Sequence, residues 1–440
     1  GTRLPSEREL SAALMLSRTT VTRAYAELRD RGYLTSRQGS GHVVTLPGSA
    51  AGRRQGSSLD PAIDRRSSEI IDLTCASMSA PAGIVTAYER AMDQLPRYLA
   101  GTGYHPLGLL GLRESLAQRF TERGLPTSPE QVMVTSGALA GLAVTARALL
   151  SPGDRVMVES PTYPNAVDTL RRAGARAVGL PLERGGWDIE SAQATLRQTA
   201  PRAAYLIPDF QNPTGALMSD AQRAALGDAL DATRTLGIVD ETIVDLAHTA
   251  DFVMPRPLAA HHTASVTVGG ASKSFWGGLR IGWIRAPRDL MPALVSARLT
   301  LDLGAPVLEQ LALVELLAHR DEVLAARRAA VVATRDTLVN ALAGRLPQWR
   351  FQVPQGGLCL WVELPEALST PLCVAADQRG VVLAPGSQFA VDGGMERFLR
   401  LPFTGHAPEV VVDAVDRLAQ AWAVAQDARA VRPSRSPLVA

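Results

Sequence analysis

Apolar side chains recur along this chain in two rhythms, and the rhythm changes near residue 70. Before that point, apolar residues lie three and four positions apart, which is typical of small amphipathic helices. From Ile70 to about residue 428, continuous apolar runs of strand length alternate with helical runs, which indicates α/β architecture with a mostly parallel central sheet. The predicted strands are QVMVTS (131–136), DRVMVES (154–160), AAYLIPD (203–209), GIVDE (237–241) and ASVTVGG (264–270).

The first 46 residues predict two helices and a β-hairpin. Ser6 and Glu9 have the spacing of a capping box that begins the first helix, and Ser17 is the N-cap of the second. The side chains expected to face inward are Leu10, Ala13 and Leu14 of the first helix and Val21, Ala24, Tyr25 and Leu28 of the second. Gly32 ends the second helix, and two short strands then flank Gly39-Ser40-Gly41. This order predicts a winged helix-turn-helix.

Composition identifies two segments outside the folded domains and excludes several classes of protein. Residues 47–69 are rich in Pro, Gly, Ser and Arg and predict a linker, and residues 429–440 predict a disordered tail. The net charge of +2 gives no global attraction to nucleic acid, although residues 1–46 hold seven arginines against four acids. No apolar run approaches the ~18 residues of a membrane span. Three cysteines, Cys75, Cys359 and Cys373, lack metal-ligand spacing and favour a reducing, cytoplasmic location.

Five of the predicted strands deliver a distinctive group at their carboxyl ends, the edge at which open α/β sheets bind ligands. The first runs into Gly137 and a helix start that suits a phosphate. The others lead to Tyr163, Asn212, Asp240 and Lys273 in turn. Lys273 is the only lysine among 45 basic side chains, so this position requires an amine and not merely a positive charge. His261-His262 lacks a third ligand at sensible spacing, so no metal is expected.

These groups together match pyridoxal 5'-phosphate. A phosphate fits the Gly137 helix start with Ser272 and Arg280, and a flat ring fits the face of Tyr163. Asp240 suits a protonated pyridine nitrogen, Asn212 suits the phenolic oxygen, and only the Lys273 amine can condense with an aldehyde.

The N-terminal segment closely resembles the GntR family of bacterial repressors through LPSEREL, SRTTVTRAYAEL and RQGSGHVV. The resemblance implies DNA contacts by Arg8, Arg18, Thr19 and Thr20, with Gly39 and Gly41 at the wing. The family's first helix is missing, and because the chain starts at Gly1 without a methionine, we expect that it is lost from the N-terminus.

From residue 104 to residue 403 the chain resembles the fold type I aminotransferases of the aspartate aminotransferase class, through TSGA, NPTG and SKSFWGGLR in combination. The resemblance implies a large domain and a small C-terminal α+β domain over residues 70–428. It implies Lys273 as the cofactor-bearing lysine, and ring contacts by Asp240, Asn212 and Tyr163. The implied phosphate contacts are Ser136, Gly137, Ala138, Ser272 and Arg280, with Tyr104 reaching the neighbouring subunit of a homodimer. Arg400, in FLRLPF, corresponds to the arginine that clamps a substrate carboxylate.

One departure from that family bears on activity. A tyrosine usually follows the ring aspartate by two or three residues, whereas this chain has Thr242 and Ile243 there. Either Thr242 substitutes, or Asn212 alone holds the cofactor oxygen. The departure weighs against efficient transamination more than against cofactor binding.

The order of domains resembles the MocR group of transcriptional regulators. It predicts a PLP-dependent regulator that binds an operator in double-stranded DNA and senses an amino compound through formation of an external aldimine. The alternatives are an aminotransferase with an appended winged helix and a direct sensor of the cofactor level. Weak transaminase activity is compatible with each of them.

Overall fold

The computed structural model describes residues 4–14, 16–30, 33–37, 41–44, 70–183 and 185–430. The predicted linker, Gly39 of the wing and residues 431–440 of the predicted tail lie outside these ranges. Within the described part, no helix is long and apolar enough to cross a membrane.

The N-terminal module has helices α1 (Glu7–Leu14) and α2 (Arg18–Asp30) and an antiparallel hairpin of β1 (Leu34–Arg37) and β2 (Gly41–Val44). Both predicted caps are present: Ser6 and Glu9 exchange two hydrogen bonds, and Ser17 Oγ accepts from the Thr20 amide at 3.1 Å. The core consists of Val21, Tyr25 and Leu34, with Leu4 and Leu10 packed beside them.

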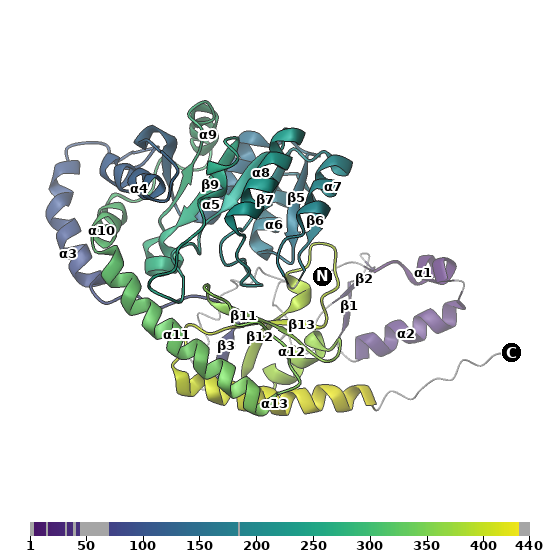
Figure 1. Ribbon diagram of the computed structural model, residues 1–440. Helices are drawn as coiled ribbons and strands as arrows, with labels where there is room; N and C mark the ends of the chain where they lie inside the picture. Colours follow the sequence, from purple (N-terminus) through teal and green to yellow (C-terminus); the bar gives the residue numbers. More distant parts are fainter. Residues whose placement is uncertain are drawn as a thin grey trace.

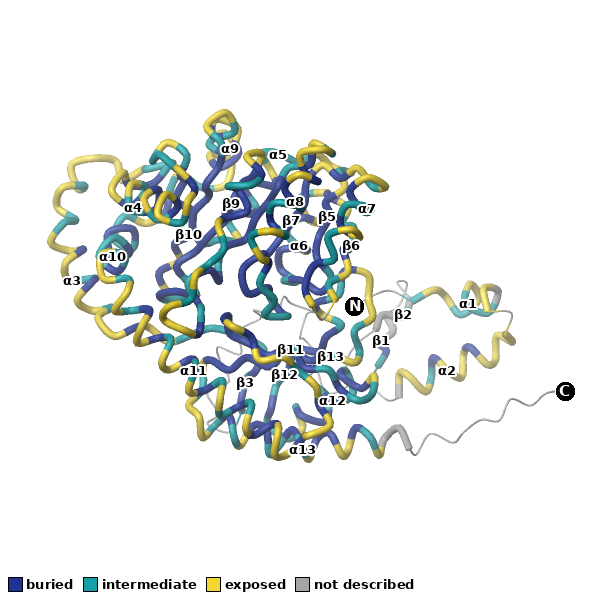
Figure 2. Tube along the Cα trace, viewed as in Figure 1, coloured by how far each residue is buried: buried dark blue, intermediate teal, exposed yellow. Residues whose placement is uncertain are grey.

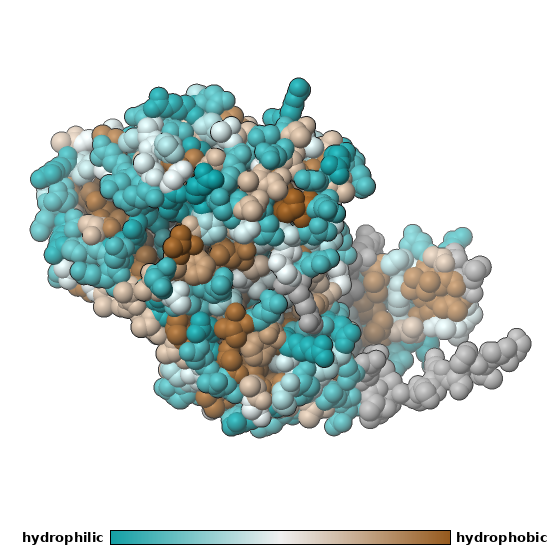
Figure 3. Space-filling view, viewed as in Figure 1, coloured by the Kyte–Doolittle hydropathy of each residue, from teal (hydrophilic) through white to brown (hydrophobic). Residues whose placement is uncertain are grey.

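Four side chains predicted to face inward in this module are solvent-exposed: Ala13, Leu14, Ala24 and Leu28. Leu14 is 54% and Leu28 39% exposed, and apolar residues gather on the surface over α1 and α2 (Figure 3). A small core of two helices and a hairpin covers only one narrow stripe of each helix. The prediction from helical spacing that these four side chains face inward was therefore wrong.

A seven-stranded sheet forms the large domain, in the order β4-β10-β9-β8-β7-β5-β6 (Figure 1). Its strands are β4 (Val132–Thr135), β5 (Arg155–Ser160), β6 (Arg176–Pro181), β7 (Ala203–Leu206), β8 (Leu236–Asp240), β9 (Ser265–Gly270) and β10 (Gly282–Arg285). Strands β6, β5, β7, β8 and β9 pair in parallel, and only β10 runs against its neighbours β4 and β9. All five predicted strands are confirmed, whereas the sequence pattern missed β6 and β10.

Alternate residues of the strands pack against helices on opposite faces of this sheet. Met157 of β5 packs with α7 (Ile189–Thr199) and α8 (Asp220–Thr233), whereas Val156 and Val158 pack with α5 (Ala138–Leu149) and α6 (Pro164–Arg172). The helix start predicted at Gly137 is confirmed, because Gly137 is the N-cap of α5. The remaining helices of the domain are α3 (Ile84–Gln94), α4 (Leu110–Glu122), α9 (Met291–Arg298) and α10 (Val307–Ala318). Figure 2 shows the strands buried between these helical layers.

The small domain has a four-stranded sheet in the order β11-β13-β12-β3. Its strands are β3 (Ile71–Leu73), β11 (Cys359–Glu363), β12 (Val381–Pro385) and β13 (Phe398–Pro402), and its helices are α11 (Arg320–Arg345), α12 (Ser369–Asp377) and α13 (Pro408–Ala430). Strand β3 precedes the whole large domain in sequence, yet it pairs in parallel with β12. Helix α13 continues two residues into the predicted tail.

Candidate functional site

A cavity of about 270 Å³ lies where strands β4, β7, β8 and β9 end at their carboxyl edge. Nine of the predicted site residues line it together: Gly137, Ala138, Tyr163, Asn212, Asp240, Ser272, Lys273, Arg280 and Arg400. Two predicted residues are not among its lining. Ser136 lies one residue before Gly137 and its carbonyl accepts from Arg280, and Tyr104 is 64% exposed on the surface.

Lys273 lies in a single π-helical turn, residues 272–276, directly after β9. Its Nζ donates to the carbonyl oxygen of Ala76 at 2.6 Å. Burial is the main influence on the amine and lowers the pKa of Lys273, with the neighbouring Arg400 adding to this. A lowered pKa increases the fraction of neutral amine, which is the nucleophilic form.

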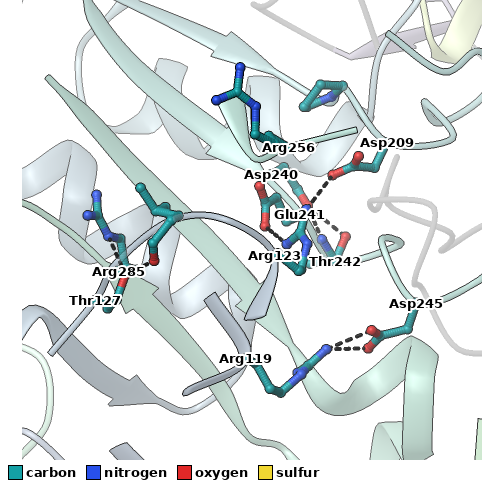
Figure 4. Close-up of polar contacts among 12 residues, drawn as sticks. Arg119, Arg123, Thr127, Asp209, Asp240, Glu241, Thr242, Asp245, Arg256 and Arg285 are labelled. Carbon is teal, nitrogen blue, oxygen red and sulfur yellow. Dashed lines mark hydrogen bonds and ion pairs between the residues drawn. The ribbon is translucent and has the colours of Figure 1, made fainter. Parts of the chain in front are cut away.

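Asp240, at the end of β8, is held by three hydrogen bonds. Its Oδ1 accepts from the Thr242 amide at 2.9 Å and the Thr242 hydroxyl at 2.6 Å (Figure 4). Its Oδ2 accepts from the Tyr205 hydroxyl at 2.7 Å. Burial raises the pKa of Asp240, and the bonds from Thr242 and Tyr205 oppose that rise. Since a threonine hydroxyl has one proton and Thr242 gives it to Asp240, that proton is not available to a cofactor oxygen.

Ion pairs fix the chain that follows Asp240 (Figure 4). Arg123 of α4 contacts Glu241 at 2.5 Å, and Arg119 of the same helix binds Asp245 at 2.6 Å. Asp245 Oδ2 also accepts from the Ser274 hydroxyl at 2.7 Å, so this network extends to the residue after Lys273. The ion pairs therefore fix Asp240 and the turn that carries Lys273 relative to each other.

The helix start at Gly137 forms a narrow cradle. Gly137 has φ +103°, and a Cβ there would lie 2.9 Å from Arg280 Nη2. Ala138 begins α5, whose first backbone N–H groups and positive dipole end suit an anion. Gly137 is therefore required both by its backbone conformation and by the close approach of a guanidinium.

Tyr163 and Asn212 lie on two loops that are connected by a buried, hydrogen-bonded pair, Gln211 and Glu159. Gln211 Nε2 donates to Glu159 Oε2 at 3.0 Å and to the Pro161 carbonyl at 2.8 Å. Glu159 is fully buried and also accepts from Trp187 Nε1 and the Ile207 amide. Burial raises the pKa of Glu159 to about 7 despite these bonds.

Arg400 is buried beside Asn212. Its Nη1 donates to Asn212 Oδ1 at 3.3 Å, its Nη2 donates to the Thr74 carbonyl, and its buried Nε has no partner. Burial lowers the pKa of Arg400. A buried guanidinium that lines the cavity and has an unpartnered N–H fits an incoming carboxylate.

The sequence pattern missed several residues of this cavity. Tyr205, Phe210, Leu358 and Cys359 read only as apolar strand or loop positions, and Thr74 to Ser77 showed no recognisable pattern. Only their position in the fold brings them to the cavity.

The candidate DNA-binding surface is in the N-terminal module. Arg8, Arg18, Thr19 and Thr20 are all exposed, the last three in the first turn of α2. The Thr20 hydroxyl lies 2.7 Å from Ser17 Oγ, and Thr22 of α2 donates to Glu7 of α1 at 2.7 Å. Gly41 begins β2 opposite Arg37.

The cavity fits pyridoxal 5'-phosphate on the chemistry of its donors. The cradle at Gly137 and Arg280 suits a dianionic phosphate, and a Cβ at Gly137 would obstruct it. The remaining groups are a buried amine of lowered pKa, a carboxylate that suits a pyridinium nitrogen and an aromatic face.

Comparison with known proteins identifies relatives of both parts. Residues 85–418 match the family "Aminotransferase class I and II", and residues 1–44 match "Bacterial regulatory proteins, gntR family". The uncharacterized HTH-type transcriptional regulator YisV of Bacillus subtilis is 29% identical over 92% of this chain and 88% of its own length. The probable rhizopine catabolism regulatory protein MocR of Rhizobium meliloti is 28% identical over 99% of this chain and 92% of its own.

Among solved structures, LysN of Thermus thermophilus is similar in fold and sequence. This α-aminoadipate aminotransferase, solved with N-(5'-phosphopyridoxyl)-L-leucine, has a TM-score of 0.74 and 27% identity. The alignment covers 86% of this chain and 97% of LysN.

Proposed function

Because this chain belongs to the class I and II aminotransferase family, whose members use pyridoxal 5'-phosphate, and has a GntR-type DNA-binding module before that domain, we propose that it is a DNA-binding transcriptional regulator that senses an amino compound. One observation carries the proposal. The same chain presents Arg18, Thr19 and Thr20 at the exposed start of α2 and has a cofactor-sized cavity around its single lysine. Similar two-part chains named as regulators support it.

In this proposal each cavity residue has one task. Lys273 binds the cofactor covalently, Asp240 faces the ring nitrogen, and Asn212 donates to the ring oxygen. Tyr163 stacks on the ring, while Gly137, Ala138, Ser272 and Arg280 bind the phosphate with Ser136 beside them. Tyr104, being exposed, reaches the phosphate site of a second copy in a homodimer. The cofactor supplies an aldehyde that reacts with amines.

The effector is an amino compound with a carboxylate, which Arg400 receives through its unsatisfied Nε and its Nη groups. Binding acts on DNA only if the effector prefers one of two arrangements of the protein. A change from 1:99 to 99:1 requires about 5.5 kcal/mol of differential binding. In this proposal, a covalent bond to the cofactor and a bidentate carboxylate contact at Arg400 supply that difference.

In the N-terminal module, Arg8, Arg18, Thr19 and Thr20 contact the operator, with the wing at Gly39 and Gly41 beside them. The first turn of α2 enters the major groove, as the second helix of this motif does in general. Arginine side chains there contact phosphates or base edges.

Aminotransferase activity is the second candidate function, and the likeness to LysN favours it. The use of the Thr242 hydroxyl on Asp240 weighs against it, because the cofactor oxygen then has one protein donor fewer. The test is single-turnover spectroscopy of the PLP-loaded protein with common amino acids. The proposal expects spectral change without conversion to the pyridoxamine form, whereas conversion within seconds would make transamination the primary function.

A direct sensor of the cofactor is the third candidate. It requires DNA affinity to change when PLP alone is added, with no amino compound present. Arg400 weighs against this, because a sensor of the cofactor alone does not need an arginine that can bind a carboxylate beside the cavity.

A further inference from the structure

Residues 74–79 follow β3 of the small domain and lead toward α3 of the large domain, and we call them the strap. Its first four residues, 74–77, line the cavity. Cations from three elements hold its carbonyl oxygens. Arg400 of β13 donates to Thr74, Lys273 donates to Ala76 at 2.6 Å, and Arg327 of α11 donates to Ser79 at 2.8 Å. Two of these three cations are the groups proposed to bind cofactor and effector.

Arg327 also contacts the turn that carries Lys273, which Arg400 does not. Its Nη2 also donates to the carbonyl of Phe275, which lies in the same π-helical turn as Lys273. One guanidinium nitrogen therefore joins the strap to the turn that carries the lysine. The turn is joined to the strap a second time by the Lys273 amine itself.

The environment of Arg327 shows that carbonyl groups, and not a carboxylate, hold it. The residue is 8% exposed, and burial lowers its pKa to about 10. Among the described residues, no carboxylate forms an ion pair with it, and its buried Nε is unpartnered. Because burying a charge without a counter-ion is costly, a purely structural position would favour an apolar residue of similar size.

We propose that Arg327 is a positioning residue that couples the Lys273 turn to the strap, so that a change at the lysine moves residues 74–79. The inference rests on the proposed function for its biological meaning, although the coupling itself is a property of this chain. The strap is continuous with β3, which pairs with β12 over three residues, and the chain before β3 leads to the DNA-binding module. Lysine chemistry in the cavity thus reaches the segment that connects the two functional parts.

Two features allow the strap to move when the Lys273 amine reacts with an aldehyde. A primary amine that condenses with an aldehyde forms a C=N bond and releases one water, so the nitrogen keeps at most one of its N–H bonds, and the bond from Lys273 to Ala76 weakens. On its other side, the continuation of the strap borders a hollow of about 740 Å³ between α11 and residues 403–407. Arg327 also lines this hollow, so the strap has room to move while Arg327 keeps it attached to the lysine turn.

The test is hydrogen exchange of the full chain, with and without PLP, followed in peptides that cover residues 70–83 and 270–282. In the wild type, PLP should change exchange in both peptides by several-fold, with no change in α8 as the reference. Arg327→Met should raise basal exchange in residues 78–83 about tenfold and abolish their response to PLP. The lysine turn and the amides beside Ala76, which Lys273 holds directly, should still respond. Arg328→Met is the matched control, because this neighbour donates to the Ala247 carbonyl and contacts neither the strap nor the lysine turn.

If Arg327→Met does not fold, Arg327→Lys replaces it, since a lysine keeps the charge but not the fixed geometry of a guanidinium. It should also uncouple the strap, whereas full rescue by lysine would contradict the proposal. A wild-type strap that ignores PLP, or residues 78–83 that still respond in Arg327→Met, would overturn it as well. None of these measurements uses DNA, so a failure of the regulatory proposal in DNA-binding assays remains separate from a failure of the coupling.

Discussion

Thr242 Oγ1 lies 2.6 Å from Asp240 Oδ1, so the hydroxyl next to the cavity serves the aspartate and is not free for a ligand. Tyr205 donates to the other oxygen of the same carboxylate at 2.7 Å. Both bonds favour the ionised form of a buried acid whose pKa burial raises. The charge of Asp240 in the cavity therefore depends on two donors.

Removing either donor should weaken cofactor binding. Thr242→Val and Tyr205→Phe each remove one hydrogen bond to a charged group, a loss of about 1.5–3 kcal/mol, so PLP affinity should fall about tenfold or more. Titration of the visible absorption of the lysine-bound cofactor measures this. Thr242→Ser is the control, because it keeps the hydroxyl and should keep the affinity, and equal affinities in all four proteins would contradict this account.

The visible absorption of the bound cofactor should depend on the single lysine. Lys273→Ala removes the only lysine amine of the chain, so the band should be absent at any PLP concentration. Absorption spectroscopy after removal of free PLP checks this. Cys75→Ser alters another residue of the same cavity and should keep the band, and a band in Lys273→Ala would refute the assignment of the cofactor site.

Arg18 should contribute to DNA affinity through charge. Arg18→Ala should weaken binding to the DNA upstream of the protein's own gene and, if it contacts a phosphate, lower the slope of log K against log salt by about 0.9. Fluorescence anisotropy at four salt concentrations measures both quantities. Arg176→Ala removes an exposed arginine from β6 and serves as the charge-matched control. Identical slopes for the Arg18 variant and the wild type would exclude a phosphate contact.

Glu159 should make stability depend on pH. Burial raises its pKa from 4.5 to about 7, so the folded chain holds a proton that the unfolded chain releases between these values. The free energy of unfolding should therefore fall as pH rises from about 4.5 to 7, by at most about 1.4 kcal/mol per pH unit from this group. Urea unfolding of the wild type and Glu159→Gln checks this: the variant should have the shallower slope, and parallel slopes would mean that Glu159 is ionised throughout.

The sequence predicted those parts of the molecule where one local signal decides the outcome. Near-continuous apolar runs identified five strands of the large sheet, and the caps at Ser6 and Ser17 located two helices. Strand β6 was missed because its residues RAVGLP are only partly buried at this edge of the sheet, which leaves a weak apolar signal.

The residues of the candidate site also fall into those that a local sequence signal predicts and those that it does not. Gly137, Asp240 and Lys273 directly follow or end strands, so their shared edge could be inferred from parallel topology. The contacts of Arg327 and of the strap could not be inferred. Arg327 meets the lysine turn from α11, and the strap reaches the cavity from a segment nearly 200 residues before Lys273 in sequence. Contacts at such separation depend on how the two domains pack, for which no local pattern exists.

The proposal that this chain is a regulator that senses an amino compound is tested by measuring DNA affinity as a function of the concentration of that compound. PLP-loaded protein is titrated against labelled DNA from upstream of its own gene, in the presence of each amino compound that alters the visible spectrum. At least one such compound should change the dissociation constant tenfold or more in the wild type. Arg400→Leu should lose this response, while its DNA affinity without the compound should be unchanged. Compounds that alter the spectrum and are turned over at enzyme-like rates, with a constant DNA affinity throughout, would contradict the proposal.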